Sequence, residues 1–388
     1  MARPVRDGMA VTDEQRQFVS LASDFALREI RPAARAVDDA QTESPLDVWR
    51  AAAKVGLTAF MLPAEHGGGG VSELVTQARI QEELCYGDIG IGNFVTSNGF
   101  YAAPILELGT PEQRSRWLDP LCTDDPPVTA LAVTEPDVGS DAASLKTTAT
   151  IRGDHYVLDG QKAWISNAPY AQSFVIFATV APGTRSKGVT AFVVDRDTEG
   201  LTVGKPIKKL GQRAIVNAEV FLDNVKVPVD NRLGEEGQGF YGLMRTFDAS
   251  RILIGSATTG LARAALDLAT EYAKQRVQFG VPIIDHQAVA FRLADMATKV
   301  DISRLMTMRA ARLFDAHEDV TAEAAMAKLT GSENAVWCTW AAIQTLGGWG
   351  YSQEFLAEKW WRDAKLEEIE EGTSDIQRLV ISRRLAKA

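Results

Sequence analysis

The first third of the chain follows the hydrophobic period of a helix. Between residues 12 and 125, apolar side chains recur at intervals of three and four, as at Phe18, Leu21, Ala22 and Phe25. This spacing places the apolar residues on one face of an α-helix. The pattern therefore predicts a segment built from several amphipathic helices.

Two helix starts can be located in the same segment. Thr12 precedes the first apolar face and Gln15 follows three residues later, which is the pattern of a capping box. Pro111 follows Thr110, and proline is favoured at the first position of a helix. We therefore expect one helix to begin near residue 12 and another near residue 111.

The pattern changes after residue 127. Short runs rich in β-branched and aromatic residues alternate with Gly, Asp and Pro turns, which is typical of strands. Because turns separate the runs, we interpret residues 128–235 as an antiparallel β-domain. The predicted strands include residues 156–158, 163–166, 174–178, 189–194 and 218–222.

The helical period returns near residue 237 and persists to the end of the chain. Residues 334–342 are apolar on most sides, which predicts a central place in a helix bundle. The sequence thus indicates an α+β fold with an N-terminal helical domain (1–127), a central antiparallel β-domain (128–235) and a C-terminal four-helix bundle (236–388). The four predicted helices of the bundle cover residues 240–273, 286–316, 321–346 and 352–371.

Composition narrows the possible partners and location. The formal net charge of the 388 residues is -10 and no basic block is present, which argues against nucleic-acid binding. Cys85, Cys122 and Cys338 are odd in number and far apart, as in a reducing compartment. Four scattered histidines predict no metal site. Without a signal-peptide pattern or an apolar run of about 20 residues, we expect a cytoplasmic protein with no membrane span.

One stretch near the C-terminus could carry chemistry. An acidic helical run reaches Glu371, Gly372 can end the helix, and Thr373 or Ser374 can cap the next one. A carboxylate on such a corner is held on a fixed backbone, which suits a general base. The alternative is that Glu371 is one more residue of a solvated acidic run.

Two further stretches lie in the β-domain, the first of them near its start. Residues 133–141 combine hydroxyls, a glycine and backbone donors in one loop, which could bond a flat polar ring and a phosphate, or form an ordinary turn. Trp164 and Ser166 lie two apart on a predicted strand and so share a face. A ring could stack on Trp164 while Ser166 bonds its edge, although a core tryptophan is the alternative.

Three stretches lie in the C-terminal helices. Asp248 and Arg251 are three residues apart, as in a simple surface ion pair. Arg276 follows a helix and precedes a loop, a place suited to a diphosphate or to stabilising the helix dipole. Residues 344–351 form a glycine-rich helix end, for which a simple C-cap is the alternative.

Taken in order, these segments resemble the acyl-CoA dehydrogenase family. The resemblance spans essentially the whole chain and rests on VTEPDVGSD, GQKAWISN, FDASR, RVQFG with HQ, QTLGGWGYS and EGTSDIQR. It implies a homotetramer that binds FAD between the β-domain and the C-terminal helices. It also implies α,β-dehydrogenation of an acyl-CoA thioester to a trans-2-enoyl-CoA, with hydride passing to flavin N5. Electrons would then pass to an electron-transfer flavoprotein.

The resemblance also implies roles for individual residues. Glu371 matches the base that abstracts the α-proton, with its pKa raised towards neutrality, and the Gly372 or Glu371 N–H would bond the thioester carbonyl together with a flavin ribityl hydroxyl. Substrate contacts are implied for Ser140, Asp248, Arg251 and Gly372. Contacts to FAD are implied for Leu131, Val133, Thr134, Gly139, Ser140, Trp164, Ser166, Arg276, Phe279, His286, Gln287, Gln344, Gly347, Gly348, Thr373 and Asp375.

Some of these contacts are expected to cross between subunits. In the family, the positions matching Arg276, Phe279, Gln344, Gly347 and Gly348 usually contact the FAD of a neighbouring subunit. Assembly and cofactor binding are therefore expected to be linked.

The sequence departs from the family pattern near the base. Glu370 stands where several relatives carry an aromatic or apolar residue, and Asp375 stands where others have Gln or Glu. Repulsion from neighbouring glutamates is expected to raise the pKa of Glu371 further. Since the Asp248–Arg251 segment offers only Ala249 and Ser250 between its charged ends, we expect no alternative base there.

The acyl group and the electron acceptor stay open. Phe94, Phe100 and Tyr101 are bulky residues near the expected acyl site, which favours a short, branched or modest-length acyl group. The acidic Glu370 also leaves room for a polar acyl group. The rival functions are an acyl-CoA oxidase or other flavin enzyme of the same fold that uses oxygen, and a non-catalytic helical interaction protein.

Overall fold

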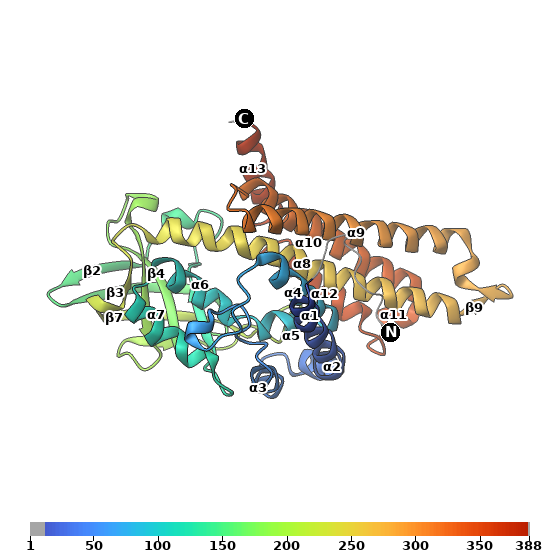
Figure 1. The fold of residues 1–388 in the computed structure, drawn as a ribbon, viewed down its shortest axis with the longest axis horizontal. Coiled ribbons are helices and arrows are strands. Elements are labelled where there is room, and N and C mark those ends of the chain that lie inside the picture. The colour runs from blue at the N-terminus through green and yellow to red at the C-terminus, as the bar shows by residue number, and fades with distance from the viewer. Residues whose placement is uncertain (1–11, 387–388) are drawn as a thin grey trace.

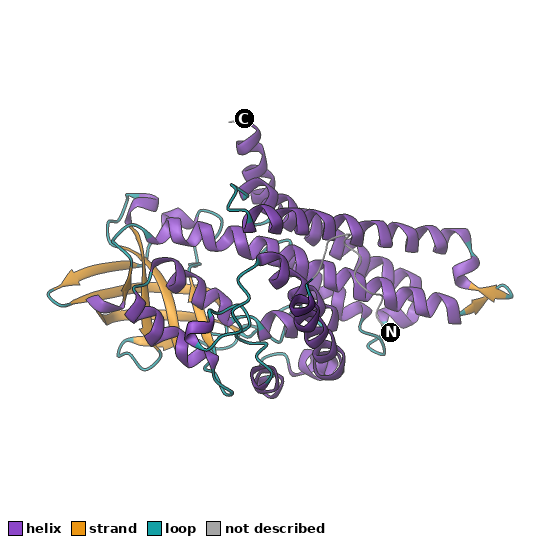
Figure 2. Cartoon of the chain, in the orientation of Figure 1, coloured by secondary structure: helices purple, strands orange, loops and turns teal. Residues whose placement is uncertain are grey.

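A computed structural model describes residues 12–386 and confirms the α+β fold. Helices lie at both ends of the described residues, the main sheet lies at one end of an elongated molecule, and a short β-hairpin lies at the other end (Figure 1, Figure 2). The C-terminal helices run along the long axis away from the sheet (Figure 2). The domain limits at 127/128 and 235/236 stay predictions.

The N-terminal segment is helical, as its apolar period predicts. The capping box of Thr12 and Gln15 is present at the start of the first helix, and Thr110 and Gln113 form another one before Pro111. The elements are α1 (Asp13–Phe25), a π-helical turn η1 (Ala26–Ile30), α2 (Arg31–Ala40), α3 (Leu46–Lys54), α4 (Leu74–Gly87), α5 (Ile89–Val95), α6 (Asn98–Leu108) and α7 (Pro111–Leu118).

An eight-stranded sheet follows. Its strands are β1 (Thr129–Ala132), β2 (Thr148–Arg152), β3 (His155–Ser166), β4 (Ser173–Thr179), β5 (Val189–Asp195), β6 (Leu201–Val203), β7 (Asn217–Pro228) and β8 (Arg232–Leu233). The order is β6-β7-β3-β2-β4-β5-β8, with β1 pairing β4. The pairings are antiparallel as expected, except that β1 and β2 each pair in parallel with β4. Residues 133–172 separate β1 from β4 and residues 153–172 separate β2 from β4, so both connections are long enough for parallel pairing.

The C-terminal bundle is built from α8 (Gly239–Gln275), α9 (Gln287–Asp315), α10 (Thr321–Leu346) and α12 (Ala357–Glu367). A common apolar core includes Leu261, Met296, Ala335 and Trp360, one from each helix. The remaining elements are a hairpin of β9 (Val277–Gln278) and β10 (Val281–Pro282), then α11 (Gly348–Tyr351) and the protruding α13 (Ser374–Leu385) (Figure 1).

The fourth bundle helix is shorter than predicted. The apolar period suggests residues 352–371, but α12 covers only Ala357–Glu367. After it, the amides of Ile369 and Glu370 both donate to the Leu366 carbonyl, and Glu371 adopts a φ of +49°. The apolar period therefore continues past the end of α12 into a tight turn. The spacing of apolar residues alone does not distinguish this turn from a last turn of helix.

Helix α8 is the central element of the structure. It is the one helix of residues 12–386 that is long and apolar enough to cross a membrane, and 83% of its most apolar window is buried inside the protein. It packs against α4, α9 and α10. Its apolar character is thus accounted for by its place in the core.

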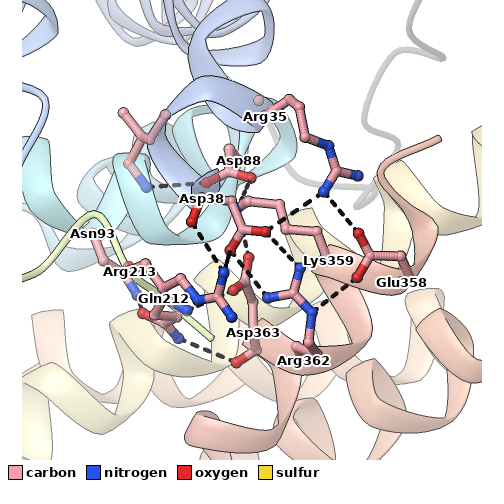
Figure 3. A network of polar contacts seen from close by, with 12 residues as sticks. Arg35, Asp38, Asp88, Asn93, Gln212, Arg213, Glu358, Lys359, Arg362 and Asp363 are labelled. Carbon is pink, nitrogen blue, oxygen red and sulfur yellow. Dashed lines mark hydrogen bonds and ion pairs between the residues drawn. The ribbon is translucent and has the colours of Figure 1, made fainter. Parts of the chain in front are cut away.

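A buried network of charges joins segments that lie far apart in the sequence (Figure 3). We call this group the Asp38–Lys359 network. Asp38 on α2 accepts hydrogen bonds from Arg362 on α12 at 3.0 and 2.5 Å. Arg213, from the loop before β7, lies 3.4 Å from the same carboxylate. Since Asp38 is 1% exposed, the N-terminal helices, the sheet and the bundle share one buried charge cluster.

The other half of the network centres on Lys359 of α12. Its ammonium group bonds the buried carboxylates of Asp88 and Asp363, the latter at 2.7 Å. Asp363 also accepts from the backbone N–H of Gln212 at 2.5 Å. Helix α12 is therefore anchored to both neighbouring parts of the chain just before the corner that carries Glu371.

Candidate active site

Glu371 lies in the turn between α12 and α13. The backbone is left-handed at two successive residues, with φ of +49° at Glu371 and +94° at Gly372. Thr373 then caps α13, because its hydroxyl accepts from the Ile376 N–H at 3.3 Å. The predicted corner is therefore present, with Thr373 rather than Ser374 as the cap.

The carboxylate of Glu371 is half-buried against α8. It accepts a hydrogen bond from the hydroxyl of Ser250. Burial raises the pKa of Glu371 to about 7, and the Glu370 carboxylate adds to the rise. The Ser250 hydrogen bond and the charges of Arg251 and Lys328 oppose it. Burial, more than the predicted repulsion between glutamates, thus makes Glu371 a base of near-neutral pKa.

The backbone of the corner is held by three helices. The Glu371 carbonyl accepts from Arg251 Nε at 3.3 Å and from Gln377 Nε2 at 3.1 Å. The Gly372 carbonyl accepts from Gln377 Nε2 at 2.9 Å and from Lys328 Nζ at 3.0 Å. Donors from α8, α10 and α13 therefore fix the two peptides on either side of Gly372.

The loop that begins at Val133 is fastened to β3. Lys162 is fully buried, and its ammonium group donates to Glu135 at 2.8 Å and to the Val133 carbonyl at 3.0 Å. The Ala163 N–H donates to the Thr134 carbonyl at 2.8 Å. This loop is thus an ordered structure beside β3, and a buried ion pair holds it in place.

Trp164 lies in a bulge of β3, and Ser166 follows where the pairing resumes. The pairing of β3 with β7 shifts register between Lys162 and Ile165, and Trp164 has a φ of +62°. The side chain of Trp164 is 57% exposed, so the alternative of a core tryptophan is wrong. Asn217 supports the bulge by donating to the Trp164 carbonyl at 2.8 Å and to the Ser166 hydroxyl at 3.2 Å.

Lys209 lies between this strand and the corner that carries Glu371. Its ammonium group donates to Asn217 Oδ1 at 2.7 Å and to two carbonyls of its own loop. Burial lowers the pKa of Lys209 to about 8, and the charge of Glu370 opposes this shift. The charge of Glu370, the residue before Glu371, therefore acts on the Lys209 ammonium group. The same ammonium group bonds Asn217, which supports Trp164 and Ser166.

Asp248 and Arg251 form a partly buried pair on α8. The closest oxygen and nitrogen are 3.4 Å apart, and the Arg251 side chain is only 8% exposed. Asp248 also accepts from the Thr321 hydroxyl at 2.9 Å, and burial raises its pKa. The alternative of an exposed surface pair is therefore wrong, whereas their predicted contact with CoA stays a prediction.

A second group of candidate residues lies elsewhere. Figure 1 places β9 and α11 at the end of the long axis opposite the sheet. Phe279 is 95% exposed with a φ of +53°, and a Cβ atom added at Gly347 or Gly348 would meet nothing within 4 Å. Within one chain these residues lie far from Trp164. We call them the far-end group, which consists of Arg276, Phe279, His286, Gln287, Gln344, Gly347 and Gly348.

The remaining candidates lie near the first group. Leu131 is in β1, Gly139 and Ser140 are exposed in the loop that follows it, and Asp375 is exposed in the first turn of α13. The aromatic residues expected to limit the acyl group behave differently. Phe94 is fully buried and its ring lies 5.1 Å from that of Trp49, so it belongs to a core rather than to an open site.

The first group fits a flavin. Trp164, exposed and with a positive φ, offers a stacking surface, and the hydrogen bond from the Ala163 N–H to the Thr134 carbonyl places Thr134 beside the strand that carries Ser166. A Cβ atom added at Gly139 would meet nothing within 4 Å, so the backbone there is open to a ligand. Together with Glu371, whose pKa lies near neutrality, these residues are the set expected of a flavin-dependent enzyme with a carboxylate beside its cofactor.

Comparison with known proteins agrees with this class. The models of the acyl-CoA dehydrogenase N-terminal, middle and C-terminal domains match residues 12–125, 130–225 and 237–386. The short-chain specific acyl-CoA dehydrogenase of Bos taurus mitochondria is 43% identical over 366 residues, which are 94% of this chain and 88% of the relative.

Solved structures give the same result. Butyryl-CoA dehydrogenase from Megasphaera elsdenii superposes with a TM-score of 0.93 at 34% identity, covering 97% of this chain and 99% of that one. The FAD complex of PigA gives a TM-score of 0.92 at 30% identity, covering 97% and 99%.

The chain belongs to the acyl-CoA dehydrogenase family. It is a flavoprotein oxidoreductase that uses FAD and acts on the CH–CH bond of an acyl-CoA thioester. The resemblance seen in the sequence motifs is thereby confirmed. The roles of the individual site residues stay predictions.

Sequence reasoning missed several residues that position the site. Glu135 and Lys162 lie inside two of the recognised motifs, but their pairing depends on the sheet. Lys328 and Gln377 contact the corner across helices, and only Gln377 belongs to a recognised motif. For Lys328, the sequence signal is a lysine on an otherwise apolar helix face, which indicates a buried polar contact.

Proposed function

We propose that Glu371 abstracts the α-proton of a short-chain acyl-CoA, giving the trans-2-enoyl-CoA. The proposal is carried by one observation: a half-buried glutamate with a pKa of about 7 at a backbone corner fixed by three helices. FAD, when bound, supplies the acceptor for the β-hydride. Near neutral pH, a large fraction of Glu371 is ionised and ready to accept the proton.

The corner also stabilises the charge that develops on the thioester. As the α-proton leaves, negative charge moves to the carbonyl oxygen, and a nearby N–H donor lowers the energy of that state. The N–H of Glu371 or of Gly372 lies at this corner, so it can bond the oxygen while the Glu371 carboxylate faces the α-carbon. The Ser250 hydroxyl orients the carboxylate by its hydrogen bond.

We further propose that the cofactor site is composite. Thr134, Trp164 and Ser166 of one chain would contact the flavin ring, and the far-end group of a neighbouring chain would complete the site. The opposite placement of the two groups in Figure 1 supports this division. A homotetramer, in which such contacts are repeated by symmetry, is the assembly we propose.

The short acyl group, the acceptor and the location are also proposals. Similarity to short-chain specific and butyryl-CoA dehydrogenases supports a short-chain acyl-CoA. The two electrons must leave the reduced enzyme, and an electron-transfer flavoprotein is the proposed acceptor. The three free cysteines, two of them buried, support a cytoplasmic location.

The test compares Glu371→Gln with Glu368→Gln, a neighbouring glutamate bonded to Lys365. With a panel of acyl-CoAs and a dye acceptor, Glu371→Gln should keep its flavin and bind product but lose about 10²- to 10⁴-fold in kcat. Glu368→Gln should retain turnover. Full activity of Glu371→Gln would refute the base assignment. Peroxide release without the dye would indicate an oxidase, and a colourless protein would refute the flavin proposal.

A further inference from the structure

Glu370 directly precedes Glu371 in the chain, and its carboxylate lacks an N–H donor. The residue is half-buried in the turn after α12, and no N–H group of residues 12–386 donates to its side chain. A carboxylate offers about four acceptor positions, and a partly buried one is costly to leave without donors. The protein therefore leaves acceptor positions of this carboxylate open beside Glu371.

Glu367, one helical turn earlier, supplies a different kind of donor to Glu370. It is fully buried, and its Oε1 accepts from Gln212 Nε2 at 2.5 Å and from Asn93 Nδ2 at 3.4 Å, whereas its Oε2 accepts no hydrogen bond. Burial raises the pKa of Glu367 well above its usual range, and the charge of Glu370 adds to the rise. Glu367 thus keeps a proton, which it donates to Glu370.

This acid pair is held by segments that are far apart in the sequence. Asn93 of α5 and Gln212 of the loop before β7 both reach Glu367, and Asn93 Nδ2 also lies 3.4 Å from Gln212 Oε1. The backbone N–H of Gln212 bonds Asp363 of α12 at 2.5 Å (Figure 3). A polar group whose support is fixed in this way presents its free oxygens in one direction.

Two lysines act on Glu370 by charge without bonding it. Lys209 directs its three N–H bonds at two carbonyls of its own loop and at Asn217 Oδ1, all within 2.9 Å. Lys328 donates to the Gly372 carbonyl at 3.0 Å. The charges of both lysines nevertheless lower the pKa of Glu370 against the effect of burial.

The balance of charge indicates which kind of ligand group suits this carboxylate. When Glu371 is ionised, the carboxylates of Glu370 and Glu371 face the ammonium groups of Lys209 and Lys328, so the formal charges cancel. A further anion would meet Glu370, and a further cation would unbalance the group. A neutral donor such as a hydroxyl group supplies the missing hydrogen bond without adding charge.

We propose that Glu370 is a specificity-determining residue whose carboxylate accepts a hydrogen bond from a hydroxyl group on the acyl chain. The inference rests on the proposed function of Glu371 and adds the chemical class of the substrate, a short hydroxyacyl-CoA. Adjacent Cα atoms are about 3.8 Å apart, so a carboxylate next to the base lies a few bonds along the acyl chain from the α-carbon. Carbon 4 or carbon 5 is the position expected for the hydroxyl group.

Two pairs of substrates of equal length test this inference. Each pair compares a terminal hydroxyl group with a methyl group: 4-hydroxybutanoyl-CoA with pentanoyl-CoA, and 5-hydroxypentanoyl-CoA with hexanoyl-CoA. The FAD-loaded wild type, with a dye acceptor, should favour the hydroxyl compound about tenfold in kcat/KM in at least one pair, because a hydrogen bond to a charged group is made only there. The ratio within one enzyme does not depend on its flavin content.

Three variants locate the preference. Glu370→Leu removes the acceptor and should abolish the preference for the hydroxyl compound. Glu370→Gln keeps the size without the charge and should give an intermediate ratio. Glu368→Gln, which changes the glutamate bonded to Lys365, should keep the wild-type ratio. For a variant without turnover, the dissociation constants of S-(4-hydroxybutyl)-CoA and S-pentyl-CoA, read from flavin absorbance, give the corresponding ratio.

Equal kcat/KM values within both pairs would overturn the inference, and this measurement needs no variant. An unchanged ratio in Glu370→Leu would also overturn it, as would a higher kcat/KM for a chain of the same length that ends in a carboxylate or a quaternary ammonium group. A wild-type enzyme that dehydrogenates no acyl-CoA would instead refute the proposed function, and the two thioethers would still decide whether Glu370 selects a hydroxyl group.

Discussion

Three candidate site residues hold a left-handed backbone although none is glycine. Trp164, Phe279 and Glu371 have φ of +62°, +53° and +49°. Such conformations cost of order 1–3 kcal/mol for residues with a Cβ atom, and they persist only where surrounding contacts enforce them. At Trp164 the support comes from Asn217, and at Glu371 it comes from donors on three helices. Specific contacts thus hold Trp164 and Glu371 in this conformation, although six other non-glycine residues of the described chain also have a positive φ.

The ionisation of Glu371 should control the rate. Only the carboxylate accepts a proton, so kcat/KM should rise with pH up to a limb near the pKa of about 7. Ser250→Ala removes a hydrogen bond that favours the charged form, so the limb should move to higher pH. A pH–rate profile of both enzymes measures this.

The matched control is Ser256→Ala, a buried serine on the same helix whose hydroxyl bonds the Ala78 carbonyl. Its limb should coincide with that of the wild type. A limb for Ser250→Ala at or below the wild-type position would contradict the electrostatic role of the hydroxyl.

At the scale of elements, a buried ion pair fastens a loop to a strand. Burial alone would raise the pKa of Glu135, but Lys162 lowers it below its usual value. The same carboxylate accepts from the N–H groups of Lys146 and Thr147 at 2.6 and 2.9 Å. Both ends of the loop that runs from Val133 to Thr147 therefore depend on one carboxylate.

Breaking this pair should release the loop. Lys162→Met leaves Glu135 buried without its cation, and such a loss costs about 3–5 kcal/mol. We expect this loss of stability in urea unfolding, together with weaker FAD retention. Adding Glu135→Gln should restore part of the stability. Lys146→Met, which breaks the exposed pair with Asp137, should have no measurable effect. Equal stability of the two lysine variants would argue against the role of the buried pair.

Local patterns predicted the elements better than their irregularities. The apolar periods and the capping box at Thr12 locate helices because both act within a few residues. The bulge at Trp164 depends on how β3 pairs with β7, about 50 residues later, so spacing gave no sign of it. The motifs around Glu371 and Trp164 indicated the site, but contacts from Lys328 and Gln377 depend on packing between helices.

At the scale of the whole molecule, the Asp38–Lys359 network ties together three parts of the chain (Figure 3). Arg362 and Lys359 both belong to α12, which leads directly into the corner that carries Glu371. Burial alone would raise the pKa of Asp38, but hydrogen bonds and charge from Arg362 lower it. The position of the corner therefore depends on ion pairs with Asp38 of α2 and with Asp88, which caps α5, and on a hydrogen bond from the loop before β7.

The network should contribute stability that depends on pH. Because the folded-state pKa of Asp38 is lowered, its contribution is present above the ordinary aspartate value and is lost as pH falls below about 4. Asp38→Asn should therefore cost about 3 kcal/mol near pH 7, with the difference from wild type shrinking in acid. Urea unfolding at several pH values measures this. A difference that stays constant down to pH 3 would contradict the assignment.

The proposed composite site can be tested by mixing two damaged chains. Glu371→Gln and Arg276→Ala should each be nearly inactive alone. When both are co-expressed with different tags and purified together, some sites combine an intact Glu371 with an intact Arg276. Random pairing gives about a quarter of the sites in this state, so dye-reduction activity should recover to a similar fraction. No recovery in a confirmed mixed oligomer would refute shared sites.

The separation of Trp164 from the far-end group along the long axis has a consequence for inheritance. If one cofactor site draws on two copies, then two alleles damaged at opposite ends of the gene product would partly compensate for each other in the same cell. Two alleles damaged at the same end would not. The pairs of alleles that compensate for each other would then divide the mutated residues into two groups, one at each end of the molecule in Figure 1.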